Sequence, residues 1–203
     1  MIFTRDSNNK KILIDNNYKI LIDNKYENYQ TMMEWEKPYM DFLVDNLKPH
    51  GEVLEIGFGL GFSFNQIQKY NIKSHTVIEC NKQVIEKITN KNVKIIEGYW
   101  QEVFDRLDKY DCIFFDDAPN NKYNKKDRFS QFLMQILKHV KQGTRLTWYC
   151  DGDEFNLDLS NYPGTIEIKK FDIKIPKNCK YTKAKDYMLA PVLTFDQVDP
   201  SRI

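Results

Sequence analysis

Glycines and acidic side chains follow several apolar runs of this chain, and together they could bind a nucleotide-type ligand. The run Val53–Ile56 ends at Gly57, and Gly59 and Gly61 follow at alternate positions. Glycine accepts a positive φ and lets a ligand approach the backbone, and the start of a helix offers unpaired N–H groups. The pattern is typical of a nucleotide-type site, although such glycines also form tight turns without a ligand.

An acidic residue at the end of the next apolar run favours the ligand interpretation. The run His75–Ile78 predicts a strand that ends in Glu79, which lies 22 residues after Gly57. At this spacing a carboxylate would accept hydrogen bonds from the two ribose hydroxyls of a nucleoside. We therefore prefer a nucleoside site to an empty turn.

Two later apolar runs lead to residues suited to the same site. The run Val93–Ile96 leads to Gly98, and the run Tyr110–Phe115 leads to Asp116 and Asp117. The C-terminal ends of parallel strands share one edge of a sheet. We therefore expect these residues, the glycine turn and the acid after the second strand to converge on one crevice.

The elements that must position this crevice alternate between strands and helices. Apolar residues recur at helical spacing from Phe129 to Val140, and Thr144–Cys150 reads as a fifth strand. The runs Thr165–Pro176 and Met188–Phe195 predict two long strands without a long helix between them. The order indicates an α/β fold that ends in a β pair.

Composition limits the possible functions. The chain of 203 residues suits one α/β domain with a small appendage, and its 30 basic and 29 acidic residues create no field for nucleic acid or an anionic membrane. The four cysteines form no CxxC pair, so we expect reduced thiols and no metal site. No signal sequence and no apolar run long enough to span a membrane is present, so we expect a cytoplasmic protein.

The N-terminal region contains a duplicated octamer. Lys11–Tyr18 is followed by the similar Lys19–Tyr26, which predicts a hairpin of two β-prone runs with an Asx-rich turn between them. We treat residues 1–28 as an appendage and residues 29–203 as the main domain. The next segment, Thr31–Leu47, predicts a helix that starts near Pro38. Taken alone, its pattern favours aromatic and methionine side chains in the core and solvated glutamates.

Six stretches of the chain form a specific combination in a fixed order. They are TMMEWEKPYM (31–40), LEIGFGLGFS (54–63), HTVIECN (75–81), EGYWQEV (97–103), FFDDAP (114–119) and CKY (179–181). In this order they resemble motifs of the guanidinoacetate N-methyltransferase family and of the related fungal arginine methyltransferases. The resemblance covers roughly residues 29–195. It implies a class I S-adenosylmethionine (SAM) methyltransferase with a Rossmann-like, mostly parallel seven-stranded sheet and a C-terminal antiparallel hairpin.

The resemblance also implies roles for individual residues. Glu36 and Asp116 would grip and deprotonate the guanidino group of a small guanidinoacetate-like molecule or a protein arginine, with Asp117 beside them. This replaces the solvated interpretation of Glu36 but not that of Glu34. The residues implied to bind SAM are Met32, Met40, Gly57, Phe58, Gly59, Leu60, Gly61, Phe62, Ser63, Glu79, Cys80, Asn81, Gly98 and Tyr99.

The chemistry suits a pair of carboxylates. A guanidinium is planar and carries five N–H donors, so two carboxylates at different angles can fix one nitrogen toward a methyl donor. A protonated guanidinium has no free lone pair, so one carboxylate must also accept a proton. No metal is required.

One departure from the family bears on the acceptor. Asp151, Asp153 and Glu154 follow the fifth strand, where the guanidinoacetate enzyme helps to hold a substrate carboxylate, and Asp117 adds another acid. These charges favour an acceptor without a nearby carboxylate, such as a protein arginine. The alternative, that these acids face solvent, is equally open.

Other functions remain alternatives. An oxidoreductase could bind NAD at the same glycine turn, and a protein of the SAM-methyltransferase fold could bind SAM or a partner without guanidino methylation. A nucleic-acid adenine methyltransferase is disfavoured, because Ala118–Asn120 offers no aromatic side chain to stack on a flipped base. We expect neither a nucleic-acid nor a membrane partner, and the oligomeric state stays open.

Overall fold

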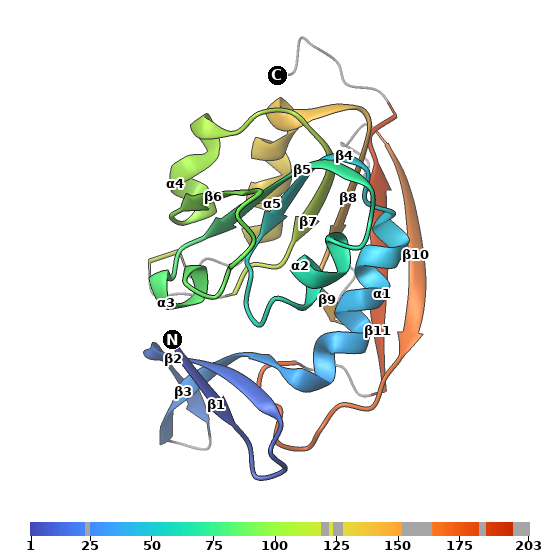
Figure 1. Ribbon diagram of the computed structural model, residues 1–203. Coiled ribbons are helices and arrows are strands. Elements are labelled where there is room, and N and C mark those ends of the chain that lie inside the picture. The colour runs from blue at the N-terminus through green and yellow to red at the C-terminus, as the bar shows by residue number, and fades with distance from the viewer. Residues whose placement is uncertain (23–24, 119–121, 124–127, 152–163, 183–185, 197–203) are drawn as a thin grey trace.

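The protein forms a large mixed β-sheet flanked by helices, with a smaller sheet at the N-terminus (Figure 1). The structure is a computed structural model of residues 1–203, and it describes all of them except residues 23–24, 119–121, 124–127, 152–163, 183–185 and 197–203.

The large sheet has the order β10-β11-β8-β7-β4-β5-β6, and the short β9 pairs with β11. The pairs among β4, β5, β6, β7 and β8 are parallel, whereas β11 is antiparallel to both β8 and β10. This arrangement confirms the predicted fold class, a mostly parallel Rossmann-like sheet with a C-terminal antiparallel pair. The strands are β4 (Gly51–Ile56), β5 (Ile72–Glu79), β6 (Val93–Glu97), β7 (Tyr110–Phe115), β8 (Val140–Trp148), β9 (Cys150–Asp151), β10 (Thr165–Asp172) and β11 (Tyr187–Thr194).

Two apolar cores cover the two faces of this sheet. Successive side chains of a strand point to opposite faces, so Ile113 and Phe115 join one core while Cys112 and Phe114 join the other. The first core packs against α4 and α5, and the second packs against α1 and α2. Burial on both faces explains why the parallel strands read as continuous apolar runs. The helices are α1 (Lys37–Leu47), α2 (Phe62–Ile67), α3 (Lys82–Ile85), α4 (Trp100–Val103) and α5 (Arg128–Ile136), with 3₁₀ turns η1 (Glu34–Glu36), η2 (Phe104–Arg106) and η3 (Leu137–His139).

The helix predicted up to Val140 ends earlier. α5 stops at Ile136, and Val140 instead begins β8, where it pairs with Tyr110 of β7. The ladder then shifts register, and Gly143 at φ +85° lies within β8 rather than in a helix-terminating loop. Val140 fits the apolar pattern of the helix because it is buried in the same core.

The N-terminal sheet has the order β1-β2-β3 and comprises Ile2–Arg5, Lys11–Ile22 and Lys25–Met33. The turn expected between the two octamers is absent. β2 instead runs from the first octamer into the second with a register shift between Asp15 and Lys19, and it pairs with β3. The repeat therefore occupies both strands of a longer hairpin.

Within the part of the chain that the structure describes, no helix is long and apolar enough to cross a membrane. All four cysteines are free thiols, as predicted.

Candidate active site

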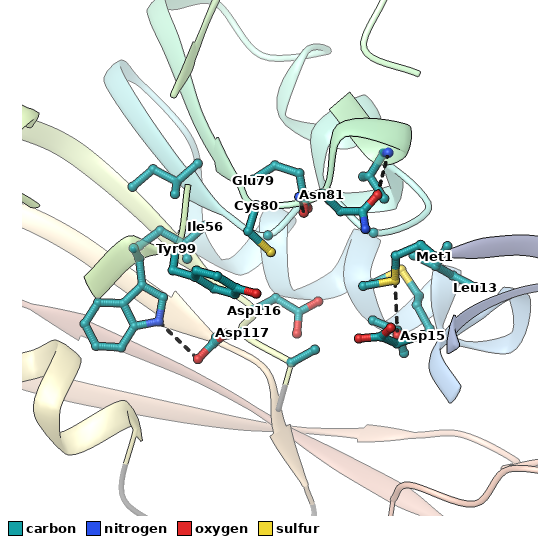
Figure 2. A pocket seen from close by; sticks show the side chains of 18 of the residues that line it. Met1, Leu13, Asp15, Ile56, Glu79, Cys80, Asn81, Tyr99, Asp116 and Asp117 are labelled. Atoms are coloured by element: carbon teal, nitrogen blue, oxygen red, sulfur yellow. Dashed lines mark hydrogen bonds between the residues drawn. The ribbon is translucent and has the colours of Figure 1, made fainter. Parts of the chain in front are cut away.

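A cavity of about 190 Å³ lies at the C-terminal ends of β4, β5, β6 and β7 (Figure 2). The glycine turn, the acid after β5, the glycine after β6 and the acids after β7 all line it, so the crevice expected at the strand ends is present. Of the residues singled out from the sequence, those in the cavity wall are Met32, Gly57, Gly59, Glu79, Cys80, Asn81, Gly98, Tyr99, Asp116 and Asp117.

The glycine turn is packed too tightly for side chains. Gly57 and Gly59 have φ values of +83° and +54°. A Cβ atom on Gly57 would lie 2.1 Å from the carbonyl oxygen of Asp116, and one on Gly59 would lie 2.8 Å from Sδ of Met32. The turn therefore packs closely against Asp116, which follows β7, and against Met32 of the N-terminal sheet. Its backbone lines the cavity.

Glu79 is held rigidly at the cavity wall. Its Oε2 accepts the N–H of Phe58 at 3.1 Å, and its Oε1 accepts the N–H of Asn81 at 2.8 Å. Burial raises the pKa of Glu79, and these donors partly offset that effect. Cys80, which also lines the cavity, further favours the charged form of Glu79 through its backbone and its side chain. The carboxylate and the backbone of the glycine turn beside it fit the ribose of a nucleoside such as that of SAM.

Other residues implied to bind SAM are not in the cavity wall. Met40 is fully buried in the apolar core, and the hydroxyl of Ser63 donates to the buried Glu55 at 2.5 Å rather than facing the cavity. The two phenylalanines of the turn and of α2 are also buried in the core. The residues that the structure leaves outside the wall are Met40, Phe58, Leu60, Gly61, Phe62 and Ser63.

Burial disfavours the ionised form of the Asp116 side chain. Burial, followed by the charges of Asp117, Glu55 and Glu79, raises the pKa of Asp116 to about 7. Among the described residues, no lysine, arginine or histidine forms an ion pair with it. A cation bound in the cavity would provide the missing compensation.

Glu36 is the second such carboxylate. It closes the 3₁₀ turn η1 with 1% of its surface exposed, and its Oε1 accepts the N–H of Met33 at 2.7 Å and the hydroxyl of Tyr181. Burial raises the pKa of Glu36 to about 8, and the charge of Asp116 contributes to the rise. The charge of Asp116 therefore acts on Glu36, although Glu36 is not among the residues that line the cavity.

The neighbouring glutamate, Glu34, differs from Glu36 in its contacts. Glu34 is only partly buried. Its side chain accepts a hydrogen bond from Nζ of Lys10 at 3.3 Å and another from the backbone N–H of Lys11 at 2.9 Å. These donors lie in the N-terminal sheet. Glu34 thus fastens that sheet to η1, while Glu36 turns inward.

Asp117 lines the cavity but already has partners. Its Oδ2 accepts Nε of Arg128 at 2.8 Å and Nε1 of Trp100 at 3.0 Å. Burial raises its pKa, and the Arg128 charge opposes that rise. Of the acids expected after the fifth strand, Asp151 belongs to β9 and pairs with Met188, whereas Asp153 and Glu154 lie outside the described residues.

One wall of the cavity comes from the N-terminal sheet, which the sequence interpretation had treated as an appendage. Met1, Leu13, Asp15 and Thr31 line the cavity. Figure 2 shows the first three across the cavity from the carboxylate of Asp117. Alternating β patterns identify the strands but not where their sheet docks, so no local signal could have revealed this wall.

Structural comparison defines the class of protein. A spermidine synthase from Thermotoga maritima matches with a TM-score of 0.61 at 13% identity, covering 98% of this chain and 74% of that one. A tRNA (m1A58) methyltransferase from Aquifex aeolicus matches with a TM-score of 0.58 at 14% identity, covering 86% of this chain and 80% of that one. These similarities show the class I SAM-methyltransferase fold.

Sequence comparison identifies the family. The model of the guanidinoacetate N-methyltransferase family matches residues 21–163, and the chain belongs to this family. Protein arginine N-methyltransferase 2 of Candida glabrata is 40% identical over 96 residues, or 42% of this chain and 23% of that protein. The Saccharomyces cerevisiae protein of the same name is 32% identical over 97 residues, or 42% and 24%. The chain thus matches about a quarter of the length of these relatives.

Proposed function

We propose that this protein is a SAM-dependent N-methyltransferase that methylates a guanidino nitrogen, either of a small guanidinoacetate-like molecule or of an arginine side chain. The observation that carries the proposal is the pair Glu36 and Asp116. Burial raises the pKa of both carboxylates, the charge of Asp116 adds to the rise for Glu36, and neither forms an ion pair with a cationic side chain among the described residues.

A guanidino cation matches this pair physically. Two nearby buried carboxylates resist ionisation because of desolvation and mutual repulsion. A guanidinium supplies both positive charge and five N–H donors in a fixed plane, and its hydrogen bonds to carboxylates are charge-assisted. Binding would lower the pKa of both acids and fix one nitrogen in place.

The donor end of the site suits SAM, which supplies an electrophilic methyl group when bound. Glu79 would accept the ribose hydroxyls, and the backbone around Gly57 and Gly59 would lie against the methionine part. Cys80, Gly98 and Tyr99 would border the adenosine. Holding two reactants in an aligned geometry could account for several kcal/mol of the barrier, out of the ~7–11 kcal/mol available to proximity.

The acid pair can also take up the proton that the reaction releases. The nitrogen must lose a proton as it is methylated, and a base works best when its pKa lies near the working pH. The raised pKa values of about 8 for Glu36 and about 7 for Asp116 show that both side chains hold a proton more readily than an exposed carboxylate does. Because Asp116 is in the cavity wall, it is the better-placed base, and Glu36 supports it.

The cavity favours an acceptor without a carboxylate. Its described wall includes Asp15, Glu79, Asp116 and Asp117 but no lysine or arginine. A guanidinoacetate carboxylate would have no cationic partner in this part of the wall. We therefore expect an arginine-containing peptide, or a guanidino compound with a neutral or cationic tail, to be methylated faster than guanidinoacetate.

A methylation assay with labelled SAM tests the proposal. Guanidinoacetate, alkylguanidines and arginine peptides would be compared, together with Glu36→Gln and Asp116→Asn. We expect at least a hundredfold loss in kcat/KM for either variant, because each removes a charge-assisted contact of about 1.5–3 kcal/mol and impairs proton uptake. Glu34→Gln is the matched control and should remain active. Equal activity of all three variants, or binding of NAD in place of SAM in calorimetry, would refute the proposal.

A further inference from the structure

Tyr181, from the connection between β10 and β11, contacts the side chain of Glu36. Its hydroxyl donates to Oε1 of Glu36, the same oxygen that accepts the N–H of Met33. The ring of Tyr181 stacks on Trp35 with centroids 6.4 Å apart and planes inclined by 24°, and Tyr29 packs at 6.5 Å. The tyrosine is therefore fixed by its ring as well as by its hydroxyl.

The segment that carries Tyr181 is fastened to the N-terminal sheet. The side-chain amide of Gln30, in β3, donates to the carbonyl of Asn178 at 3.1 Å and accepts the N–H of Lys180 at 2.9 Å. Asn178 in turn donates to Asp6 at 3.0 Å. These contacts join the connection between β10 and β11 to a sheet that also lines the cavity.

We propose that Tyr181 is a positioning residue of the acceptor site, whose hydroxyl holds the Glu36 carboxylate in one orientation and stabilises its charged form for the incoming guanidino cation. The inference rests on the function proposed above. An oxygen atom of a carboxylate has about two lone-pair sites, and Oε1 already accepts two donors. A guanidino group would therefore pair with Glu36 through Oε2, and the second carboxylate of the grip would be Asp116.

The charge balance around Glu36 supports this role for Tyr181. The groups that face Glu36 are Tyr181 and Cys179 from the β10–β11 connection, Tyr149 beside β8, and Asp116 at the end of β7. Asp116 opposes ionisation of Glu36, whereas the hydrogen bonds from Tyr181 and Met33 favour it, as does the nearby hydroxyl of Tyr149. Burial raises the pKa of Tyr181 well above its usual value, so the hydroxyl stays protonated and can only donate to the carboxylate.

A titration of Glu36 tests the coupling without requiring turnover. Carbon-13 NMR of labelled glutamate side chains would give the Glu36 pKa in the wild type, in Tyr181→Phe and in Tyr70→Phe. Tyr70 is a matched control, because its hydroxyl also donates to a carboxylate, Asp45, at 2.7 Å. Losing one hydrogen bond to a charged group should raise the Glu36 pKa by about one to two units in Tyr181→Phe only. An unchanged or lower pKa would overturn the inference.

Kinetics separates positioning from simple obstruction. With a guanidino acceptor, Tyr181→Phe should raise the acceptor KM about tenfold and leave the KM for SAM unchanged. If the hydroxyl merely blocked Glu36, removing it would lower the acceptor KM, which would overturn the inference. Gln30→Ala removes the hydrogen bonds to Asn178 and Lys180 but keeps the Tyr181 hydroxyl, so it should raise the acceptor KM by a smaller factor. The same variant tests the inference if Tyr181→Phe fails to fold. A wild-type protein that methylates no guanidino compound would refute the proposed function, while the NMR titration would still decide the role of Tyr181.

Discussion

Replacing the Glu36 carboxylate with an amide should make the protein more stable at alkaline pH and inactive. In Glu36→Gln the side chain keeps an oxygen that can accept the N–H of Met33 and the hydroxyl of Tyr181. The change removes only the charge, which burial opposes. Stability and activity should therefore move in opposite directions, as expected where a site holds unfavourable groups for function.

The direction and size follow from the pKa of Glu36. In the folded protein the pKa is raised from 4.5 to about 8, so the folded state binds this proton more tightly than the unfolded state does. The contribution of this proton to the free energy of unfolding is complete below about pH 4.5, and it is lost as the pH rises through about 8. At about 1.4 kcal/mol per pKa unit, the wild type would lose up to about 5 kcal/mol that Glu36→Gln retains. This corresponds to about 10 °C or more in Tm for a chain of this size.

The measurement is equilibrium urea unfolding of the wild type, Glu36→Gln and Glu34→Gln at pH 5, 7 and 9. We expect Glu36→Gln and the wild type to agree most closely at pH 5 and to diverge toward pH 9, with the control following the wild type. Asp116 still titrates in all three proteins, so the free energy of unfolding of each one should still change with pH. Parallel curves for the wild type and Glu36→Gln would refute the claim that burial raises the Glu36 pKa.

Three further predictions address the donor end of the site and its surroundings. Gly57→Ala should lower the free energy of unfolding by about 2–4 kcal/mol in urea unfolding, because φ is +83° and its Cβ would meet the Asp116 carbonyl at 2.1 Å. Glu79→Gln should weaken S-adenosylhomocysteine binding about tenfold or more in calorimetry, since charge-assisted hydrogen bonds are worth about 1.5–3 kcal/mol; unchanged affinity would remove Glu79 from the donor site. Arg128→Met should destabilise the protein by about 1–3 kcal/mol and raise the pKa of Asp117, as carbon-13 NMR of labelled aspartates would report, because it leaves a buried carboxylate with one fewer partner.

The sequence was sufficient for the parts of the structure that depend on local patterns. Apolar runs identify the central strands, and the rule that parallel strands end at one edge places Gly57, Glu79, Gly98 and Asp116 around one cavity. The end of α5 was less certain from sequence, because Val140 is buried in the same core whether it continues a helix or starts a strand. Its pairing with β7 decides the outcome, and pairing is not a local property.

The inward orientation of Glu36 could not be derived from its neighbours. Glu34 and Glu36 flank the same tryptophan, and both could be solvated. Glu36 is buried, and it accepts a hydrogen bond from Tyr181, which lies 145 residues later in the chain. Glu34 is drawn the other way by Lys10 and Lys11 of the N-terminal sheet. Only the resemblance to a family distinguished these two residues before the structure was known.

The contrast between Asp116 and Asp117 explains which acids the fold uses for structure and which it leaves for a ligand. The two residues are adjacent, both line the cavity, and burial raises the pKa of both. Asp117 accepts hydrogen bonds from Arg128 and Trp100, and the Arg128 charge compensates its own whether or not a ligand binds. Asp116 forms no ion pair with a cationic side chain among the described residues, and the negative charges around it raise its pKa further than burial alone does. Burying an acid without a compensating charge is costly, so the counter-ion of Asp116 is best sought in the acceptor.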